Sequence, residues 1–420
     1  MTHGDSPLTV QTTPAPEIAE LTQGAAEVLP HGGLEAKLKE RAGKPLRVKL
    51  GFDPTKPDLH IGHAVVLNAL RRFQDKGHQV VIIIGDFTAT IGDPTGKEAT
   101  RPPLSTDEVN ANAKTYLEQL GLVLDLSKTE VRYNSEWLAK MSMVDCLKLT
   151  AQTTVAQMLA RDNFAKRYER NDPIGLHEFM YPLLQGHDSV VIDADIEMGG
   201  TDQKFNNLMG RQLQESAGKP AQVVMLYPIL EGTDGVQKMS KSLNNYIGLT
   251  DAPEDMYGKV MSVPDALLEN YYRLASCLSL SEIEETLAGY KAGTLHPRDA
   301  KMRLARAIVS RYHGPEAGQR GEDAFVRQFQ QRQIPDDMPE VTLASLGLEG
   351  DTAGILALLS GAKLVASTSE ARRLIQQGGI KLHQGDEATT VSDPQATVAI
   401  PAEGLIIQVG KRRFARISRG

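Results

Sequence analysis

The stretch from Pro45 to Gly85 constrains the fold more than any other part of the chain. It contains an apolar run that ends at Phe52, apolar residues at helical spacing between Ile61 and Phe73, and a second apolar run, VVIII. Short apolar runs next to glycine indicate buried strands, so the pattern predicts a strand, a helix and a second strand. The two strands of such a unit are parallel, and its ligand site lies at the carboxyl end of the first strand, beside the helix N-terminus.

The segment GFDPTKPDLHIGH lies at this predicted ligand site. Its two histidines, His60 and His63, are three residues apart at the start of the helix. Taken alone, they could be a metal pair, a solvated helix cap or donors to a polyphosphate. A second basic motif, KMSKS at Lys238 to Ser242, places two lysines and two hydroxyl groups on one loop next to glycine. This second motif favours the polyphosphate interpretation.

Length and composition indicate a cytoplasmic protein of two or three domains. The chain has 420 residues, of which 41% are hydrophobic, which is enough for real cores. Its two cysteines, Cys146 and Cys277, lack metal-ligand spacing, and we expect both to be buried small residues in a reducing compartment. No stretch has the roughly 20 apolar residues that cross a bilayer, and the N-terminus shows no apolar signal segment.

Charge is distributed unevenly. The net charge is −7, but residues 361–420 contain nine Lys and Arg against five Asp and Glu, a local charge of +4. The preceding 360 residues therefore carry −11. A basic C-terminal segment on an acidic chain is typical of a local RNA-binding module.

The motifs HIGH and KMSKS, unaltered and in this order, resemble those of class I aminoacyl-tRNA synthetases. The run YPLLQGHD places Tyr181, Gln185 and Asp188 on one stripe of a helix, which resembles the tyrosine-binding helix of tyrosyl-tRNA synthetases. Pro182 predicts that this helix begins only just before Tyr181, because proline is tolerated in a first turn and not in an interior. The segment GGTDQ, residues 199–203, matches a further motif of that family.

This resemblance implies an α/β fold: a Rossmann-type parallel-sheet catalytic domain, then a helical domain and a small α+β S4-like domain. It also implies three groups of site residues. The catalytic group is His60, His63, Lys97, Arg101, Lys238 and Lys241. The tyrosine-binding group is Asp93, Tyr181, Gln185, Asp188 and Gln203. The ATP-binding group is Gly51, Asp53, His60, Gly62, His63, Gly199, Gly200, Asp202, Lys238, Met239, Ser240, Lys241 and Ser242.

In the family, the helix tyrosine and glutamine and a loop aspartate, here Asp93, hold the substrate's ammonium group, and Asp188 matches the aspartate that receives its phenol. The polar loop from Asp86 to Pro103 is turn-rich and is not expected to be core. It is either a mobile surface loop or the carrier of Asp93 and the phosphate-binding Lys97 and Arg101.

Position 49 departs from the family pattern. Many bacterial relatives have a tyrosine two residues before the Gly-Phe-Asp-Pro strand end, which shares the phenol with the aspartate. This chain has Lys49 there. Another contact is therefore expected to replace the missing tyrosine.

The expected domain boundaries follow from the same resemblance and from local composition. We expect a disordered N-terminus at 1–16, a catalytic domain at 17–246, a helical anticodon-side domain at 253–335, a linker at 336–350 and an S4-like domain at 351–420. Within the catalytic domain, residues 106–170 are expected to be a helical insertion that makes the homodimer interface, as in relatives. Its basic end, residues 160–170, is either a solvated face or a contact to the tRNA acceptor stem.

The resemblance implies tRNA(Tyr), L-tyrosine and ATP with Mg²⁺ as partners and substrates, with no protein-bound metal. The RNA-binding residues expected in the S4-like domain are Arg372, Arg373, Lys381, Lys411, Arg412 and Arg413. Three alternatives fit parts of the pattern: a tryptophanyl synthetase, a nucleotidyltransferase that does not act on tRNA, and an RNA-binding or splicing protein without catalysis. The polar stripe of the helix is evidence against the first alternative, the basic C-terminal segment against the second, and the intact motifs against the third.

Overall fold

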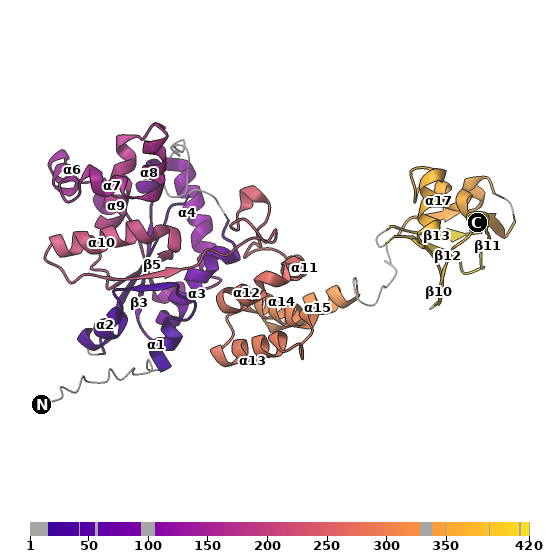
Figure 1. The fold of residues 1–420 in the computed structure, drawn as a ribbon, viewed down its shortest axis with the longest axis horizontal. Coiled ribbons are helices and arrows are strands. Elements are labelled where there is room, and N and C mark those ends of the chain that lie inside the picture. Colours follow the sequence, from indigo (N-terminus) through magenta and orange to yellow (C-terminus); the bar gives the residue numbers. More distant parts are fainter. Residues whose placement is uncertain are drawn as a thin grey trace, which may run out of the picture. The chain divides into compact units, whose positions relative to one another are not determined.

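The computed structural model describes residues 16–41, 43–54, 58–93, 106–327, 338–348, 350–385, 387–410 and 413–419. The expected disordered segment therefore lies almost wholly outside the described residues. Contacts divide the chain into two compact units, Met1–Phe325 and Val326–Gly420, which are described separately (Figure 1).

A six-stranded sheet organises the first unit, in the order β1-β6-β5-β2-β3-β4. The strands are β1 (Glu27–Leu29), β2 (Arg47–Phe52), β3 (Gln79–Ile84), β4 (Thr129–Tyr133), β5 (Ile196–Gly200) and β6 (Val223–Tyr227). All neighbouring pairs are parallel except β1 and β6, which are antiparallel. The α/β class and the parallel sheet predicted from the sequence are confirmed.

The strand, helix and strand predicted from residues 45–85 are confirmed as β2, α3 (Ile61–Asp75) and β3. The helix ends before Gly77, whose φ of +83° lies in the left-handed region that glycine adopts at little cost. Alternate residues of β2 face opposite sides of the sheet. Val48 and Leu50 pack into the large core with α3, whereas Lys49 faces the other side.

Helices cover both faces of the sheet (Figure 1). On the face opposite α3 lie α9 (Leu176–Val191) and α10 (Lys204–Ser216), which pack closely against each other. The α3 face is covered as well by α1 (Pro16–Leu21) and α2 (Gly33–Arg41). This layering leaves the carboxyl ends of β2 and β5 open between α3 and α9.

Two short strands form the edges of the sheet. One is β1, at the antiparallel edge of the sheet, and the other is β4, within the expected helical insertion at 106–170. Every residue of β4 is partly exposed, as expected for an edge strand that lacks the apolar run of a buried one. The insertion also contains α4 (Thr106–Leu120), η2 (Leu126–Lys128), α5 (Ser135–Leu138), α6 (Met143–Thr150), α7 (Val155–Leu159) and α8 (Asp162–Glu169).

The helical region after residue 250 shares the core of the sheet region. Its elements are α11 (Pro253–Ser262), η5 (Asp265–Leu267), α12 (Leu268–Ala275), α13 (Leu280–Lys291), α14 (Pro297–His313) and α15 (Pro315–Phe325). His296 is the N-cap of α14, and Gly314 is its C-cap. Tyr272 and Leu304 belong to the same buried cluster as Val48. The helices are therefore part of the first compact unit.

The second unit is a small α+β fold. Its five-stranded sheet has the order β10-β9-β12-β13-β7, and β8 pairs with β11. The elements are β7 (Glu340–Thr342), η7 (Ala344–Leu346), β8 (Thr352–Gly354), α16 (Ile355–Gly361), α17 (Thr368–Gln376), β9 (Ile380–Gln384), β10 (Glu387–Thr390), β11 (Thr397–Ala399), β12 (Leu405–Val409) and β13 (Arg413–Ser418). Residues 340–346, predicted to belong to a linker, are instead part of this fold because β7 pairs with β13.

The two cysteines are free, but neither is buried as predicted. Cys146 is partly exposed on α6, and Cys277 is exposed in the turn after α12, where its φ is +56°. A turn between helices leaves a short side chain in solvent, whereas the prediction from composition required a core position.

Candidate active site

A cavity of about 420 Å³ lies at the carboxyl ends of β2 and β5, at the edge that the sequence predicted. Its walls come from β2, the start of α3, the segment after β3, α9, β5 and the loop after β6. Most of the predicted residues line it: Gly51, Asp53, His60, Gly62, His63, Asp93, Tyr181, Gln185, Asp188, Gly199, Gly200, Asp202, Gln203, Lys238, Met239, Ser240 and Lys241.

The two histidines form the N-terminal turn of α3. His60 is the N-cap, and its backbone N–H donates to Nδ1 of His63 at 3.3 Å. Burial lowers the pKa of His63 to about 4, so its ring is neutral at physiological pH. Because Nδ1 accepts a hydrogen bond, the ring proton lies on Nε2. His63 can therefore offer a neutral N–H donor to a ligand, but not a positive charge.

The backbone of the KMSKS loop is anchored at the two residues between its lysines. The backbone N–H of Met239 donates to Leu230 at 3.0 Å, and the N–H of Ser240 donates to the side chain of Asn245 at 2.8 Å. Lys241 begins η4 (Lys241–Leu243) and forms an ion pair with Asp58, which precedes the HIGH motif. Both lysines of the motif are thereby held at the cavity.

Helix α9 begins at Leu176, earlier than predicted, and Pro182 lies inside it. The first turn is fixed by Glu178, which accepts the backbone N–H of Gly175 at 2.8 Å and forms a buried ion pair with Arg167 at 2.6 Å. These contacts hold the turn that precedes Pro182, a residue that cannot itself donate a backbone hydrogen bond. Tyr181 thus lies in the second turn.

Tyr181 connects the helix to β2 through Asp53. Its hydroxyl donates to Asp53 Oδ2 at 2.9 Å, and Thr88 donates to Oδ1 of the same carboxylate at 2.8 Å. Burial raises the pKa of Asp53 to about 7, although both hydrogen bonds act in the opposite direction. The residue that the sequence assigned to ATP binding therefore lies beside the tyrosine-binding group.

Asp188 is a residue of α9, and its carboxylate faces α5. Trp137 Nε1 donates to its Oδ1 at 2.9 Å, and Asn134 Nδ2 donates to its Oδ2 at 3.4 Å. Burial raises its pKa to about 7, while the charge of Lys49 and these two donors lower it. A carboxylate in this setting is a strong acceptor for a hydroxyl that enters the cavity.

Asp93 and Gln203 meet at the opposite wall. Gln203 Nε2 donates to Asp93 Oδ2 at 2.9 Å, and Arg161 lies 3.5 Å from Oδ1. The glycines at 199 and 200 leave room for polar side chains at this wall. A Cβ added at Gly199 would lie 3.0 Å from the side chain of Gln203, and one added at Gly200 would lie 2.6 Å from the carboxylate of Asp202.

Some predicted residues lie elsewhere. Lys97 and Arg101 are outside the described residues, as are Lys411 and Arg412. Ser242 is exposed beside Ser240 and is not among the cavity-lining residues. In the second unit Arg372 and Arg373 are exposed on α17, Lys381 lies on β9, and Arg413 donates to the carbonyl of Leu364 at 2.7 Å.

The basic end of the insertion is partly buried: Lys166 and Arg170 are exposed, but two of its arginines are not. Arg161 and Arg167 are buried, the first near Asp93 and the second paired with Glu178. Both hold the insertion helices against the rest of the unit.

Sequence reasoning missed Asp58, Thr88 and Asn134, all of which line the cavity. Asn134 directly follows β4, so the rule that ligand sites lie at carboxyl ends of parallel strands would have found it had β4 been recognised. Thr88 lies in η1 (Thr88–Thr90) and is buried, although the sequence placed the whole loop on the surface.

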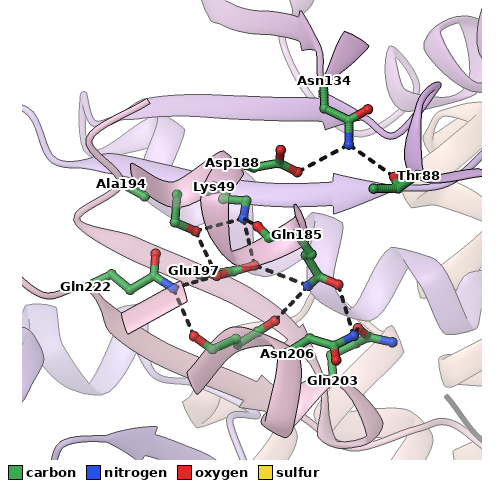
Figure 2. A network of polar contacts seen from close by, with 12 residues as sticks. Lys49, Thr88, Asn134, Gln185, Asp188, Ala194, Glu197, Gln203, Asn206 and Gln222 are labelled. Atoms are coloured by element: carbon green, nitrogen blue, oxygen red, sulfur yellow. Dashed lines mark hydrogen bonds and ion pairs between the residues drawn. The ribbon is translucent and has the colours of Figure 1, made fainter. Parts of the chain in front are cut away.

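Lys49 does not line the cavity. Its side chain is fully buried on the α9 side of the sheet and bonds to Gln185, Ser189 and Glu197 (Figure 2). It therefore does not replace the family tyrosine as a direct contact.

Within the described residues, no group of three or more His, Cys, Asp or Glu side chains is placed to hold a metal ion. In the same part of the chain, no helix is both long and apolar enough to cross a membrane.

Comparisons with known proteins agree with the site. A family model described as tRNA synthetases class I (W and Y) matches residues 41–330. The tyrosine–tRNA ligase of Moorella thermoacetica is 53% identical over 405 residues, which are 96% of each chain. That of Idiomarina loihiensis is 52% identical, over 97% of this chain and 99% of its own.

Solved structures share the fold at lower identity. A C-terminally truncated mitochondrial tyrosyl-tRNA synthetase of Aspergillus nidulans matches with a TM-score of 0.63 at 22% identity, covering 74% of this chain and 93% of its own. The tyrosyl-tRNA synthetase of Archaeoglobus fulgidus, complexed with L-tyrosine, matches with a TM-score of 0.59 at 23% identity, covering 73% and 98%. On the strength of the full-length relatives and the family model, the chain belongs to the tyrosine–tRNA ligases, within the class I tRNA synthetases.

Proposed function

We propose that the chain joins L-tyrosine to tRNA(Tyr) in two steps. Tyrosine first reacts with ATP to give tyrosyl-adenylate and pyrophosphate, and the tyrosyl group is then transferred to the 3′-terminal ribose of the tRNA. The observation that carries this proposal is one cavity that joins the HIGH turn, the KMSKS loop and the polar stripe of α9.

In the first step, the tyrosine carboxylate attacks the α-phosphate of ATP, and the bond to pyrophosphate breaks. This reaction needs orientation and compensation of negative charge rather than a protein nucleophile. Lys238 and Lys241 supply the positive charges, and His60 and His63 supply ring N–H donors. Lys97 and Arg101 are proposed to add charge from the adjoining loop. Mg²⁺ enters as part of the nucleotide substrate.

Tyrosine fits the cavity with its phenol at Asp188 and its ammonium group among Tyr181, Gln185 and Asp93. Asp53 adds a second carboxylate at the ammonium end, through its hydrogen bond with Tyr181. Gln203 is proposed to orient the substrate carboxylate. Asp202 and the glycine pair before it are proposed to contact the ribose of ATP, where the absence of side chains admits close approach.

Pyrophosphate exchange with each of the twenty amino acids tests the proposal. Tyrosine alone should support rapid exchange. Exchange with tryptophan would assign the chain to the other specificity of the matched family, and the absence of exchange with any amino acid would contradict an activating enzyme.

We further propose that tRNA phosphates bind the second unit through Arg372, Arg373 and Lys381, together with the basic residues at 411 and 412. Exposed arginines on a short helix beside a basic strand end give position and salt-sensitive affinity. Such an enzyme would act in the cytoplasm, where tRNA is used. Arg413 is less suited to this role because it already bonds to Leu364 and Glu370.

A homodimer is proposed through the outer face of α6, α7 and the start of α9. Large apolar side chains gather there in exposed positions: Met143, Val144, Leu147, Val155 and Leu176. A cavity of about 400 Å³ lined by Val155, Met158, Leu176 and Leu183 lies on the same face. Exposed apolar side chains beside an apolar cavity are typical of association surfaces, and the family resemblance makes a second copy of this chain the occupant.

Sedimentation of the unaltered chain and of Leu147→Asp would test the dimer. The unaltered chain should sediment as a dimer and the variant as a monomer. A matched control is Leu280→Asp, which changes an exposed leucine on another helix of the unit. A monomeric unaltered chain would contradict the proposal.

A further inference from the structure

A buried ion pair lies directly behind the cavity. Lys49 of β2 and Glu197 of β5 are cross-strand neighbours, and their side chains are 0% and 1% exposed, with 2.9 Å between Nζ and Oε1. The flanking positions in the same cross-strand row are Val81 and Val224. Removing two charges from water is costly, and apolar residues of similar volume often pack at least as well. Packing alone therefore does not account for the pair.

Lys49 uses all three of its N–H donors. Besides Glu197, it donates to the carbonyl of Gln185 at 3.0 Å and to Oγ of Ser189 at 2.8 Å. These two acceptors lie one helical turn apart on α9. The lysine therefore fixes both the distance and the rotation of α9 relative to the sheet.

Glu197 extends this contact to the side chains of the site. Its Oε2 accepts from Ser189 Oγ at 3.0 Å and from Gln222, and its Oε1 lies 3.4 Å from Gln185 Nε2 (Figure 2). The amide of Gln185, one of the predicted tyrosine-binding residues, is thus held from behind by a buried carboxylate.

The hydrogen bonds continue along the wall of the cavity. Asn206 Nδ2 donates to Oε1 of Gln185 at 3.0 Å and to Oε1 of Gln203 at 2.9 Å. Gln203 Nε2 in turn donates to Asp93 at 2.9 Å. An unbroken series of hydrogen bonds therefore joins the ion pair to three residues of the tyrosine-binding group, and Figure 2 shows its labelled part from Lys49 to Gln203.

We propose that Lys49 and Glu197 act as positioning residues for tyrosine: they lock α9 to the sheet and orient the amides of Gln185 and Gln203 toward the ammonium and carboxylate groups of the substrate. This inference rests on the proposed function. The lysine does not stand in for a phenol contact. It supports the amino-acid end of the site and leaves the phenol to Asp188.

The decisive variant is Lys49→Met/Glu197→Met, which removes both charges and so leaves no buried charge without its partner. Kinetics of tyrosine-dependent pyrophosphate exchange and thermal melting are measured together. We expect a folded protein whose KM for tyrosine rises about 10-fold to 100-fold, as small misplacements of binding groups cause. The KM for ATP should change by less than about 2-fold, because the ion pair does not contact the HIGH turn or the KMSKS loop.

The preference for tyrosine over phenylalanine shows whether the ion pair acts at the amino-acid end of the substrate or at its phenol. The double variant should keep its preference for tyrosine over phenylalanine within about 3-fold, because the hydrogen bonds that Trp137 and Asn134 donate to Asp188 are not altered. A loss of that preference would place the lysine's role at the phenol and overturn the inference.

Two further variants complete the test. Glu130→Gln is the matched control, because Glu130 also pairs with a cation of β2, Arg47, but lies outside this hydrogen-bond series. The KM of this variant for tyrosine should not change. Asn206→Ser interrupts the series without altering the ion pair and should raise the KM for tyrosine in the same direction. It decides the question if the double variant does not fold.

An unchanged KM for tyrosine in a folded double variant, or in Asn206→Ser, would contradict the inference. It would show that the ion pair contributes to the fold but does not position the residues that bind tyrosine. A failure of the proposed function looks different, since the unaltered chain would then show no tyrosine-dependent exchange.

Discussion

At the scale of single residues, burial sets the protonation of the site. It raises the pKa of Asp53 and of Asp188 to about 7 and lowers that of His63 to about 4. The directions are opposite because burial disfavours the charged form of an acid and of a base alike. At neutral pH the site thus combines an uncharged histidine donor with two carboxylates that are partly protonated. Both raised acids bind protons more tightly when folded, so their contribution to stability falls as pH rises from about 4 to about 7.

The raised pKa of Asp188 predicts a pH dependence of tyrosine use. Protonation at about pH 7 weakens the acceptor for the phenol, so kcat/KM for tyrosine should fall as pH is lowered from about 8 to about 6, approaching roughly tenfold per unit. Asp188→Asn should flatten much of this profile, with the remainder due to Asp53. A flat profile for the unaltered chain would contradict the assignment.

Asp188 should also govern discrimination against phenylalanine. Without the phenol hydroxyl, its buried carboxylate loses a partner and keeps its desolvation cost. Rejection of phenylalanine by tyrosyl-tRNA synthetases is itself the established example of this effect. The prediction specific to this chain is that Asp188 is the residue responsible. In pyrophosphate exchange, the Asp188→Ala variant should have more similar kcat/KM values for tyrosine and phenylalanine than the unaltered chain. Full retention of the preference would move phenol recognition to another residue.

The two KMSKS lysines should matter for chemistry more than for tyrosine binding. Lys238→Ala and Lys241→Ala should each slow single-turnover adenylate formation by about 10² to 10³ and leave the affinity for tyrosine nearly unchanged. Lys204→Ala is a suitable control, because this lysine pairs with Glu27 and does not line the cavity. Unchanged adenylation in both loop variants would exclude a catalytic loop.

At the scale of elements, a buried ion pair connects the insertion to α9. Arg167 of α8 and Glu178 of α9 are 4% and 3% exposed and lie 2.6 Å apart. Because α9 carries three of the cavity-lining residues, Tyr181, Gln185 and Asp188, the insertion helices help to fix the proposed site from outside the cavity. If the chain dimerises through α6 and α7, the Arg167–Glu178 ion pair would also connect that interface to the proposed substrate site.

Breaking this ion pair on one side should destabilise the fold. Arg167→Met leaves Glu178 charged and buried, so we expect a loss of about 3 to 5 kcal/mol in urea unfolding. Arg167→Met/Glu178→Leu should recover much of that loss. Lys166→Met, which removes an exposed ion pair with Asp162, should cost at most about 1 kcal/mol. Equal effects of Arg167→Met and Lys166→Met would contradict the argument.

At the scale of the whole molecule, chemistry and the proposed RNA contacts belong to different units. The cavity is built entirely from residues of the first unit, whereas the +4 segment lies in the second. The helices α11 to α15 share the core of the first unit, so the division between compact units falls after them.

A chain ending at Phe325 should therefore make tyrosyl-adenylate at a normal rate but charge tRNA poorly. Phosphate contacts release counterions, so the full chain's tRNA affinity should fall more steeply with salt than that of the shortened chain. Aminoacylation and tRNA binding at two ionic strengths would measure both effects. Equal charging rates and equal salt slopes would show that the second unit does not hold the tRNA.

The sequence by itself determined the elements whose signals are local. The β2–α3–β3 unit and the α9 stripe both follow from periodicity within short stretches of the chain. Apolar spacing is enough for this part, because it predicts which residues face a core. The edge of the sheet where the cavity lies followed from the same pattern.

Only the tertiary structure decided features that depend on partners distant in sequence. The short strands β1 and β4 carry weak local signals and form because a neighbouring strand offers hydrogen bonds. Helix α9 begins at Leu176, ahead of Pro182, where Arg167 and Glu178 pair beside its first turn. Lys49 became a buried partner of Glu197 because β5, which is distant in the chain, lies beside β2. The free energy of such contacts depends on burial and pairing, which no window of neighbouring residues contains.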